Sequence, residues 1–366
     1  MNLHYPAPSK TQQNTMFPLL SHVFMASLTA GLALIPSAPS MAQSSSTIYG
    51  VVDLGFVRES GGPNGTSASR LTSGVASGSR LGFRGNEDLG GGLSAFYALE
   101  MGLLADTGGL AQGGLAFGRQ ATVGIHGNFG SIALGRQYTP VALIQTETDP
   151  FVTGLAGDSA NLISAGGASG NNRMDNTLRY SYKASSGLMA DAVYGFGEVA
   201  GDSSAKRQYG GALGYVAGPA YAKLGYHNVN DATGKAGRLT FLGATYDFGF
   251  AMAHFNYVVN KGSAVFGIVN QDSRDMLLGI SVPYGLGKFM ASYIRKDDRT
   301  IANFDASQWA VGYMYFLSKR TTLYTSIARI DNNASATSKT GFYRVGNATE
   351  QGLGSRAFNF GIRHAF

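Results

Sequence analysis

Residues 354–366 read GSRAFNFGIRHAF, and they show a strand pattern that runs to the last residue of the chain. Phe358, Phe360 and Ile362 occupy alternate positions, and Phe366 lies on the same side. Alternate side chains of a strand point to one face. The last residues of a soluble domain usually fray unless something holds them. We therefore expect a terminal strand that pairs with other strands along its whole length.

The same alternation recurs in short segments elsewhere. In 285–295, GLGKFMASYIR, the residues Phe289, Ala291 and Tyr293 share one face and Lys288 lies on the other. Comparable segments are 248–258, FGFAMAHFNYV, and 176–183, NTLRYSYK. A period of two with one apolar and one polar face predicts strands.

The connections between these segments are of two kinds. Short turns are predicted at 87–92, 127–130, 185–187, 217–219, 247–249, 284–287 and 318–320, and longer polar connections lie between them. Sixteen strands follow: 47–57, 78–87, 93–103, 117–127, 131–138, 176–184, 188–197, 207–217, 220–229, 237–248, 250–260, 273–284, 287–296, 307–317, 321–331 and 354–366. An even number places both ends of the strand array on the side of the short turns.

Ten-residue alternating strands with short turns on one side and long loops on the other are typical of an all-β, antiparallel transmembrane β-barrel. A sheet that crosses hydrocarbon must close, because no water satisfies a free edge there. Sixteen strands enclose an aqueous lumen. A soluble β-sandwich or propeller also alternates, but it explains neither the two kinds of connection nor the aromatic residues near strand ends, such as Tyr49, Tyr246, Tyr284 and Phe316.

Composition supports strands and excludes several classes of protein. The chain has 52 Gly and 19 Tyr plus 21 Phe, that is 40 of these two aromatics, and no Cys. Interior glycine disfavours helices, and without cysteine no disulfide stabilises the fold. The net charge of +6 is spread over single residues, so nucleic acid is not an expected partner.

The N-terminal residues differ from the rest. An uncharged stretch, VFMASLTAGLALI at 23–35, precedes the small-x-small triplet Ser40-Met41-Ala42. This arrangement predicts a cleaved signal peptide over 1–42 and a single mature barrel domain over 43–366. The uncharged stretch is too short for a transmembrane helix.

Several motifs resemble the general, non-specific, trimeric porins of Gram-negative bacteria. They are TIYGVVDLGF, SRLGFRGNEDLGGGLSAFYALE, FGRQATVGIHGNFGSIALGRQYTP and the closing FNFGIRHAF, and together they span the mature chain. The resemblance implies passive diffusion of small hydrophilic solutes and ions across the outer membrane. It also implies a homotrimer surrounded by outer-membrane lipid and lipopolysaccharide, and a terminal Phe366 that the outer-membrane insertion machinery reads.

In that family the third loop folds inward and its acidic residues face arginines on the wall. The candidate loop here follows Gln137 and ends before Asn176. Its apolar residues, among them Ile144 and Phe151, need a surface to pack against. Glu147 and Asp149, and also Asp158, are its candidate constriction acids.

Candidate basic residues lie on the predicted wall. Arg80 matches the SRLGF motif and faces inward by alternation, as does Arg84. Arg119 matches FGRQA, but alternation leaves open whether it faces the lumen or a neighbouring subunit. Arg173 resembles a third family arginine, and Arg179 and Lys183 face inward by alternation alone. Opposed rows of charge would set ion preference, here a modest preference for anions, although each arginine could simply be a solvated charge.

Two rival functions remain. A substrate-specific channel would line its pore with aromatic residues, and the loop offers few. A barrel enzyme would need a nucleophile with a base, yet the four mature histidines are isolated in sequence and no G-x-S-x-G motif occurs. We expect no enzymatic activity, no cofactor and no metal.

Overall fold

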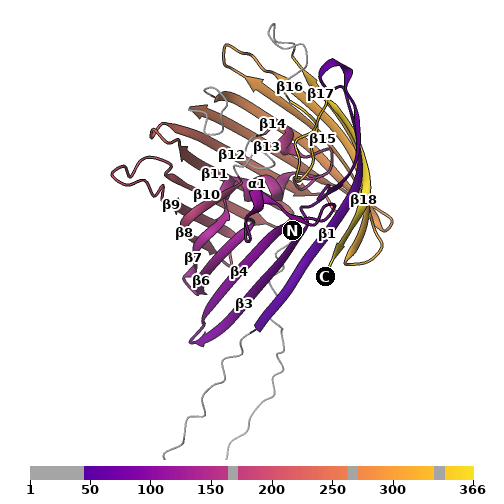
Figure 1. Cartoon of the computed structure of the whole chain (residues 1–366). Coiled ribbons are helices and arrows are strands. Elements are labelled where there is room, and N and C mark those ends of the chain that lie inside the picture. The colour runs from indigo at the N-terminus through magenta and orange to yellow at the C-terminus, as the bar shows by residue number, and fades with distance from the viewer. Residues whose placement is uncertain (1–44, 164–171, 263–270, 334–342) are drawn as a thin grey trace, which may run out of the picture. The chain divides into compact units, whose positions relative to one another are not determined.

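The computed structural model describes residues 45–163, 172–262, 271–333 and 343–366. The predicted signal peptide lies outside these ranges. Strands make up most of the described chain, and each pairs with its neighbours in antiparallel register (Figure 1). No helix within the described ranges has both the length and the apolar character to cross a membrane.

The described strands form one sheet. Their bounds are β1 Ser45–Ser60, β2 Ala68–Ser73, β3 Arg80–Gly90, β4 Leu93–Leu104, β5 Gly109–Leu110, β6 Gln120–Gly127, β7 Gly130–Tyr138, β8 Arg173–Lys183, β9 Leu188–Gly195, β10 Gln208–Ala217, β11 Ala220–Asn230, β12 Ala236–Asp247, β13 Met252–Gly262, β14 Gln271–Tyr284, β15 Gly287–Asp298, β16 Ala306–Phe316, β17 Thr321–Asn332 and β18 Arg356–Ala365. Two of them, β2 and β5, are short additions within connections. The remaining strands form a closed sixteen-stranded antiparallel barrel, which confirms the predicted fold.

Closure occurs between the first and last strands. The pairing of β1 with β18 runs from Val51 opposite Ala365 to Ser60 opposite Arg356, and β1 also pairs with β3. Beyond the end of β18, Phe366 N donates to Gly50 O at 3.1 Å and Gly50 N donates to Phe366 O at 3.2 Å. The last residue is therefore held by the first strand, and the sheet has no free edge there.

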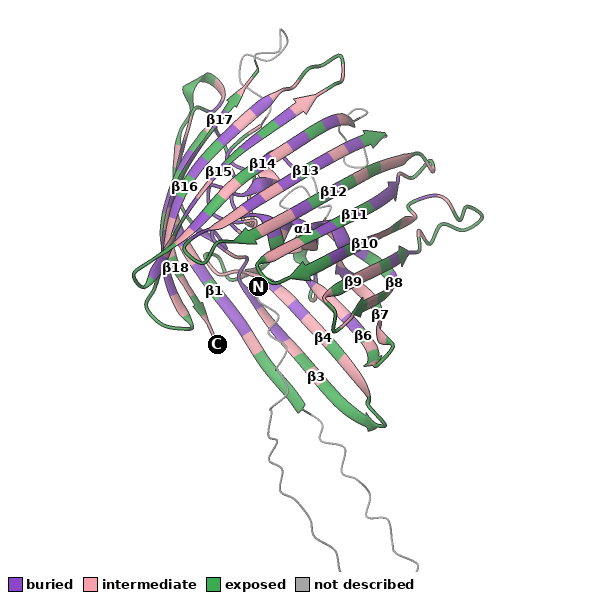
Figure 2. Ribbon diagram, turned by 180° about the vertical axis from the view of Figure 1, so that it is seen from behind, coloured by how far each residue is buried: buried purple, intermediate pink, exposed green. Residues whose placement is uncertain are grey.

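Burial alternates along the strands as the sequence predicts (Figure 2). In β18, Phe358, Phe360 and Ile362 are exposed, whereas Ala357 and Asn359 are buried. The exposed apolar residues form the outer face of the wall. The opposite face carries the polar residues and the packed core.

Two differences from the predicted elements have local causes. The connection after β1 contains β2, which pairs back onto β1 from Leu54 opposite Ser73 to Glu59 opposite Ala68. A helix, α1 at Pro140–Thr148, begins the connection after β7. It starts there because Thr139 Oγ1 accepts from Ala142 N at 3.1 Å and Pro140 occupies the first turn, where its missing N–H costs nothing.

A charge on the outer face should destabilise the barrel. Phe360 is 51% exposed and lies near the middle of β18, so Phe360→Arg should lower the free energy of unfolding in lipid vesicles by about 2–4 kcal/mol. Denaturant titration of vesicle-embedded protein measures this change. Phe360→Leu, which keeps the face apolar, is the control, and equal stability of the two variants would contradict the outward orientation.

Candidate functional site

The segment Thr139–Ile163, which contains α1, packs against the polar face of the wall. Four glycines on that face, Gly225 on β11, Gly243 on β12, Gly279 on β14 and Gly312 on β16, leave room for it. We call these four residues the glycine track. They lie on β11, β12, β14 and β16, and the intervening strands β13 and β15 meet the segment through side chains such as Asn256 and Lys296.

The fit along the glycine track is close. A Cβ added at Gly243 would lie 2.5 Å from Ile144 Cγ2, and one added at Gly312 would lie 2.8 Å from Phe151 Cε1. Both Ile144 and Phe151 are fully buried. The apolar residues that the sequence predicted to need a packing surface therefore lie directly on the backbone of the wall.

Polar contacts hold the segment to the wall at several places. Ala156 N donates to Ser326 Oγ on β17 at 3.0 Å, and Asn161 Nδ2 donates to Gln308 Oε1 on β16 at 2.9 Å. In its first half, Thr148 Oγ1 donates to Asn256 Oδ1 at 2.5 Å, and Thr148 O lies 3.2 Å from Nδ1 of His254. Near its end, Lys296 Nζ donates to Leu162 O at 3.1 Å. The wall residues come from β13, β15, β16 and β17, so the segment is held by strands far from it in sequence.

Two of the three candidate acids are buried within the segment. Asp149 accepts from Phe151 N at 2.9 Å, from Thr153 N at 3.1 Å and from Ser159 N at 3.0 Å. Asp158 caps the following short turn by accepting from Ala160 N at 2.8 Å. Both carboxylates thus support the fold of the segment itself.

Glu147 differs from these two acids because its side chain is 44% exposed. It contacts β11, where Tyr221 Oη donates to Glu147 Oε2 and Lys223 Nζ lies 3.5 Å from the same atom. Its negative charge is therefore partly balanced by an adjacent lysine.

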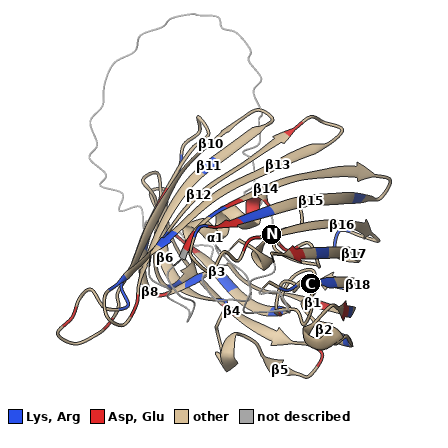
Figure 3. Cartoon of the chain, turned by 90° about the horizontal axis from the view of Figure 1, so that it is seen from above, with Lys and Arg blue, Asp and Glu red and all other residues tan. Residues whose placement is uncertain are grey.

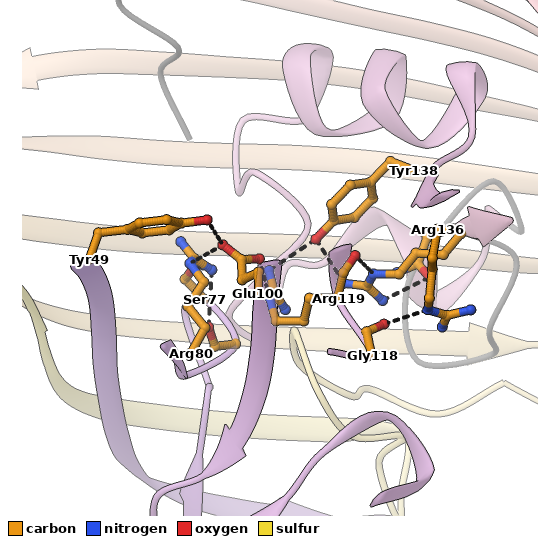
Figure 4. Close-up of polar contacts among 11 residues, drawn as sticks. Tyr49, Ser77, Arg80, Glu100, Gly118, Arg119, Arg136 and Tyr138 are labelled. Carbon is orange, nitrogen blue, oxygen red and sulfur yellow. Dashed lines mark hydrogen bonds and ion pairs between the residues drawn. The ribbon is translucent and has the colours of Figure 1, made fainter. Parts of the chain in front are cut away.

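A cluster of arginines surrounds one glutamate on the polar face of the wall, around β3, β4 and the start of β6 (Figure 4). Arg119 Nε donates to Glu100 Oε1 at 2.7 Å, and Arg80 Nε lies 3.6 Å from Glu100 Oε2. Tyr49 Oη also donates to Glu100 Oε2 at 3.0 Å. Arg119, whose orientation alternation left open, points toward Glu100.

Tyr138 joins a third arginine to this cluster. Arg119 Nη2 and Arg173 Nη2 donate to Tyr138 Oη at 3.0 and 2.7 Å. Arg173 lies over the ring, 4.5 Å from its centroid. Arg173 Nε also donates to Arg119 O at 3.0 Å. Three predicted arginines, Arg80, Arg119 and Arg173, therefore meet around Glu100 and Tyr138, and we call these five residues the arginine cluster.

The other predicted bases lie apart from Glu100. Arg179 pairs with Asp191 through Nε at 2.8 Å, and Arg84 lies over the ring of Tyr49 at 5.0 Å. Lys183 is exposed at the end of β8. Figure 3 shows the lysines and arginines of the strands in blue and the aspartates and glutamates in red.

Sequence reasoning missed Glu100, Tyr138 and Asp191. Glu100 lies opposite Gly82, one inward position from Arg80, but the register of β3 with β4 shifts between Asp88 and Gly90, so counting outward from the turn would not have found it. Tyr138 has no distinguishing signal in the sequence, because many tyrosines of this chain lie near the ends of predicted strands. Asp191 offered no motif, and only the register of β8 with β9 brings it next to Arg179.

Comparison with known proteins is consistent across sequence and structure. Residues 26–335 match a family model described as Gram-negative porin. The chain is 34% identical to outer membrane porin protein 32 of Delftia acidovorans over 93% of this chain and 99% of that protein. It is 28% identical to an outer membrane porin protein of Bordetella pertussis, over 93% and 98% of the two chains. It is also similar to the solved anion-selective porin from Comamonas acidovorans, with a TM-score of 0.73 and 32% identity over 88% and 100% of the chains.

Burial of Asp158 should make stability depend on pH. Burial, together with the nearby Asp149 carboxylate, raises the pKa of Asp158 well above its usual value of about 3.9. The folded state then holds a proton that the unfolded state releases, so stability falls as pH rises above about 4. Asp158→Asn keeps an acceptor for Ala160 N and should lessen this fall.

Melting temperature measured between about pH 4 and pH 8 tests this expectation. The matched control is Asp88→Asn, because Asp88 is exposed and accepts from Gly90 N in a turn. Parallel pH profiles for wild type and Asp158→Asn would contradict a buried, destabilised carboxylate.

Proposed function

The chain belongs to the Gram-negative porins, and on this premise we propose that segment Thr139–Ile163 and the arginine cluster together form the constriction of its channel. The protein is an outer-membrane porin with a general diffusion channel. The packing of the segment on the glycine track supports this constriction. A segment held there occupies part of the cross-section of the barrel, on the polar side of the wall.

We propose a modest preference for anions. The arginine cluster contains Arg80, Arg119 and Arg173 but one carboxylate, Glu100, which leaves a formal charge of 3 − 1 = +2. Glu147 is the exposed acid of the segment, and Lys223 partly balances it. A water-filled waist lined by excess positive charge raises the local concentration of anions. The anion-selective porin from Comamonas acidovorans adds support from a related protein.

Asp149 and Asp158 have a different proposed task. Their carboxylates accept backbone N–H groups and are buried, so we assign them to holding the segment in shape. Arg84, Arg179 and Lys183 are proposed to contribute to the charge of the wall away from the cluster.

Several proposals follow from the family alone. They are a homotrimer, surrounding lipid and lipopolysaccharide, recognition of Phe366 by the insertion machinery, and removal of residues 1–42. Small hydrophilic solutes and ions are the proposed cargo.

We propose no enzymatic role. The one histidine–serine contact in the described residues that resembles catalytic geometry joins His254 Nε2 to Ser281 Oγ at 2.9 Å. The other ring nitrogen faces the carbonyl of Thr148 rather than an acid, and both side chains are largely buried under the segment. This contact is better explained as part of the docking of the segment.

Neutralising single charges in the arginine cluster should shift ion selectivity in opposite directions. Arg80→Gln lowers the local charge to +1 and should reduce the chloride-to-potassium permeability ratio about twofold, whereas Glu100→Gln should raise it by a similar factor. Reversal potentials of single channels in a planar bilayer under a KCl gradient measure the ratio. Lys319→Gln, in an exposed turn, is the control, and a shift of equal sign in both cluster variants would contradict the proposal.

Blocking the glycine track should enlarge the channel. A valine at position 243 cannot share space with Ile144 and Thr148, so Gly243→Val should displace the segment and give larger, less uniform single-channel conductance. Gly109→Ala is the control, because its Cβ would meet other atoms only at 3.6 Å or more. Unchanged conductance of Gly243→Val would show that the segment does not narrow the pore.

A further inference from the structure

A fully buried carboxylate, Asp53, lies on the inner face of β1. Its Oδ2 accepts from Ala76 N at 3.1 Å and from Ser77 N at 2.8 Å, and its Oδ1 accepts from Tyr324 Oη at 2.6 Å. Burial of a carboxylate costs free energy unless hydrogen-bond donors satisfy it. The three donors therefore fix the backbone at Ala76 and Ser77 to this strand.

The backbone of Asp53 holds the same connection at both of its ends. The connection is residues 74–79, GVASGS, which we call the 74–79 turn. Gly74 N donates to Asp53 O at 2.8 Å, and Asp53 N donates to Ser79 Oγ at 3.0 Å. Gly74 has a φ of 72°, which glycine adopts without strain. One residue of β1 thus anchors the beginning, the middle and the end of the turn.

Arg80 depends on this turn for its position (Figure 4). Its Nη1 donates to Ser77 Oγ at 3.2 Å and to Gly78 O at 3.0 Å. Its Nε lies 3.6 Å from Glu100 Oε2, which is too far for a hydrogen bond. Arg119 contacts the other oxygen of Glu100, so two like charges lie close together and repel each other. The hydrogen bonds to the turn oppose that repulsion.

The 74–79 turn also contacts the segment Thr139–Ile163. Leu155 N donates to Val75 O at 2.7 Å. A Cβ added at Gly154 would lie 2.2 Å from Ala76 O, so the two backbones are in direct contact. A shift of the turn would therefore disturb both the arginine cluster and the segment.

We propose that Asp53 is a positioning residue for ion selectivity, because it anchors the 74–79 turn and the turn holds Arg80 in the arginine cluster. The inference rests on the proposed constriction and names the residue that keeps one of its charges in place. Asp53 itself is buried and does not meet the passing ions.

The sign of the effect separates positioning from charge. If Asp53 acted through its own negative charge, its removal would make the region more positive and raise the preference for anions. If Asp53 positions Arg80, its loss releases the guanidinium from the cluster and lowers that preference.

Reversal potentials of single channels under a KCl gradient compare two variants of Asp53. Asp53→Ala removes all three side-chain acceptor contacts, so the chloride-to-potassium permeability ratio should fall about twofold, to the value of Arg80→Gln. Asp53→Asn keeps an oxygen for Ala76 N and Ser77 N, and its amide can donate to Tyr324 Oη. Its ratio should stay close to that of wild type. A rise of the ratio in both variants would overturn the proposal.

A double-mutant cycle tests whether the effect passes through Arg80. Asp53→Ala/Arg80→Gln should have the same permeability ratio as Arg80→Gln alone, since substitutions that act through one group are not additive. A general loosening of the barrel would add its own change to that of Arg80→Gln. A further fall in the double variant would therefore contradict the positioning role.

Glu59→Ala is the matched control. Glu59 is also a buried acid on the inner face of β1, but it pairs with Arg70 at 3.0 Å, so its loss should not lower the ratio. If circular dichroism shows that Asp53→Ala does not fold, Tyr324→Phe takes its place. It removes one of the three donors to Asp53 and should lower the ratio by a smaller factor, and an unchanged ratio would then overturn the proposal.

The two levels of the account fail in different ways. If Arg80→Gln lowers the permeability ratio and a folded Asp53→Ala leaves it unchanged, the positioning role of Asp53 is wrong and the proposed constriction stands. If Arg80→Gln itself has no effect, the role of the arginine cluster in selectivity is wrong, and the role of Asp53 falls with it.

Discussion

The close contact between Ile144 and the backbone of Gly243 is the constraint on which the channel depends. Side chains on the inner face of a barrel wall would normally separate a loop from the backbone of the wall by the length of a side chain. At Gly225, Gly243, Gly279 and Gly312, on β11, β12, β14 and β16, the segment approaches the backbone itself. The buried core of this protein lies largely in that contact. A sixteen-stranded wall therefore has a packed interior on one side and leaves the other side to water.

The position of the arginine cluster is related to the packing of the segment on the glycine track. Because the segment packs on β11 to β16, the arginine cluster around β3, β4 and β6 lies on a part of the wall that the glycine track does not serve. There Glu100 and Tyr138 hold three guanidinium groups in fixed positions, and Glu100 offsets the charge of one of them. Fixed like charges near water act on passing ions over several ångströms, and a single carboxylate is too few to cancel them. The residues proposed to set ion selectivity and those that pack the segment thus occupy separate regions of one wall.

Much of the fold could be predicted from the sequence, because alternation in segments such as 285–295 and the two kinds of connection are local signals. The closure of β18 onto β1 could be predicted as well, since a terminal strand without a partner would fray. The surroundings of Asp149 could not. A carboxylate in a polar loop reads as solvated, and only the folded segment brings three backbone N–H groups to it. Glu100 was overlooked for a similar reason, as its role depends on which side chains the register of β3 with β4 places beside it.

The docking of the segment can be measured directly because the chain contains no cysteine. Thr148 and Asn256 touch across the contact between the segment and β13. In the double variant Thr148→Cys/Asn256→Cys, mild oxidation of the folded protein should form a disulfide, detected by peptide mass spectrometry, and leave single-channel conductance unchanged. If both thiols instead stay reduced and react with a maleimide in the folded barrel, the segment does not lie on the wall and the account of the constriction is wrong.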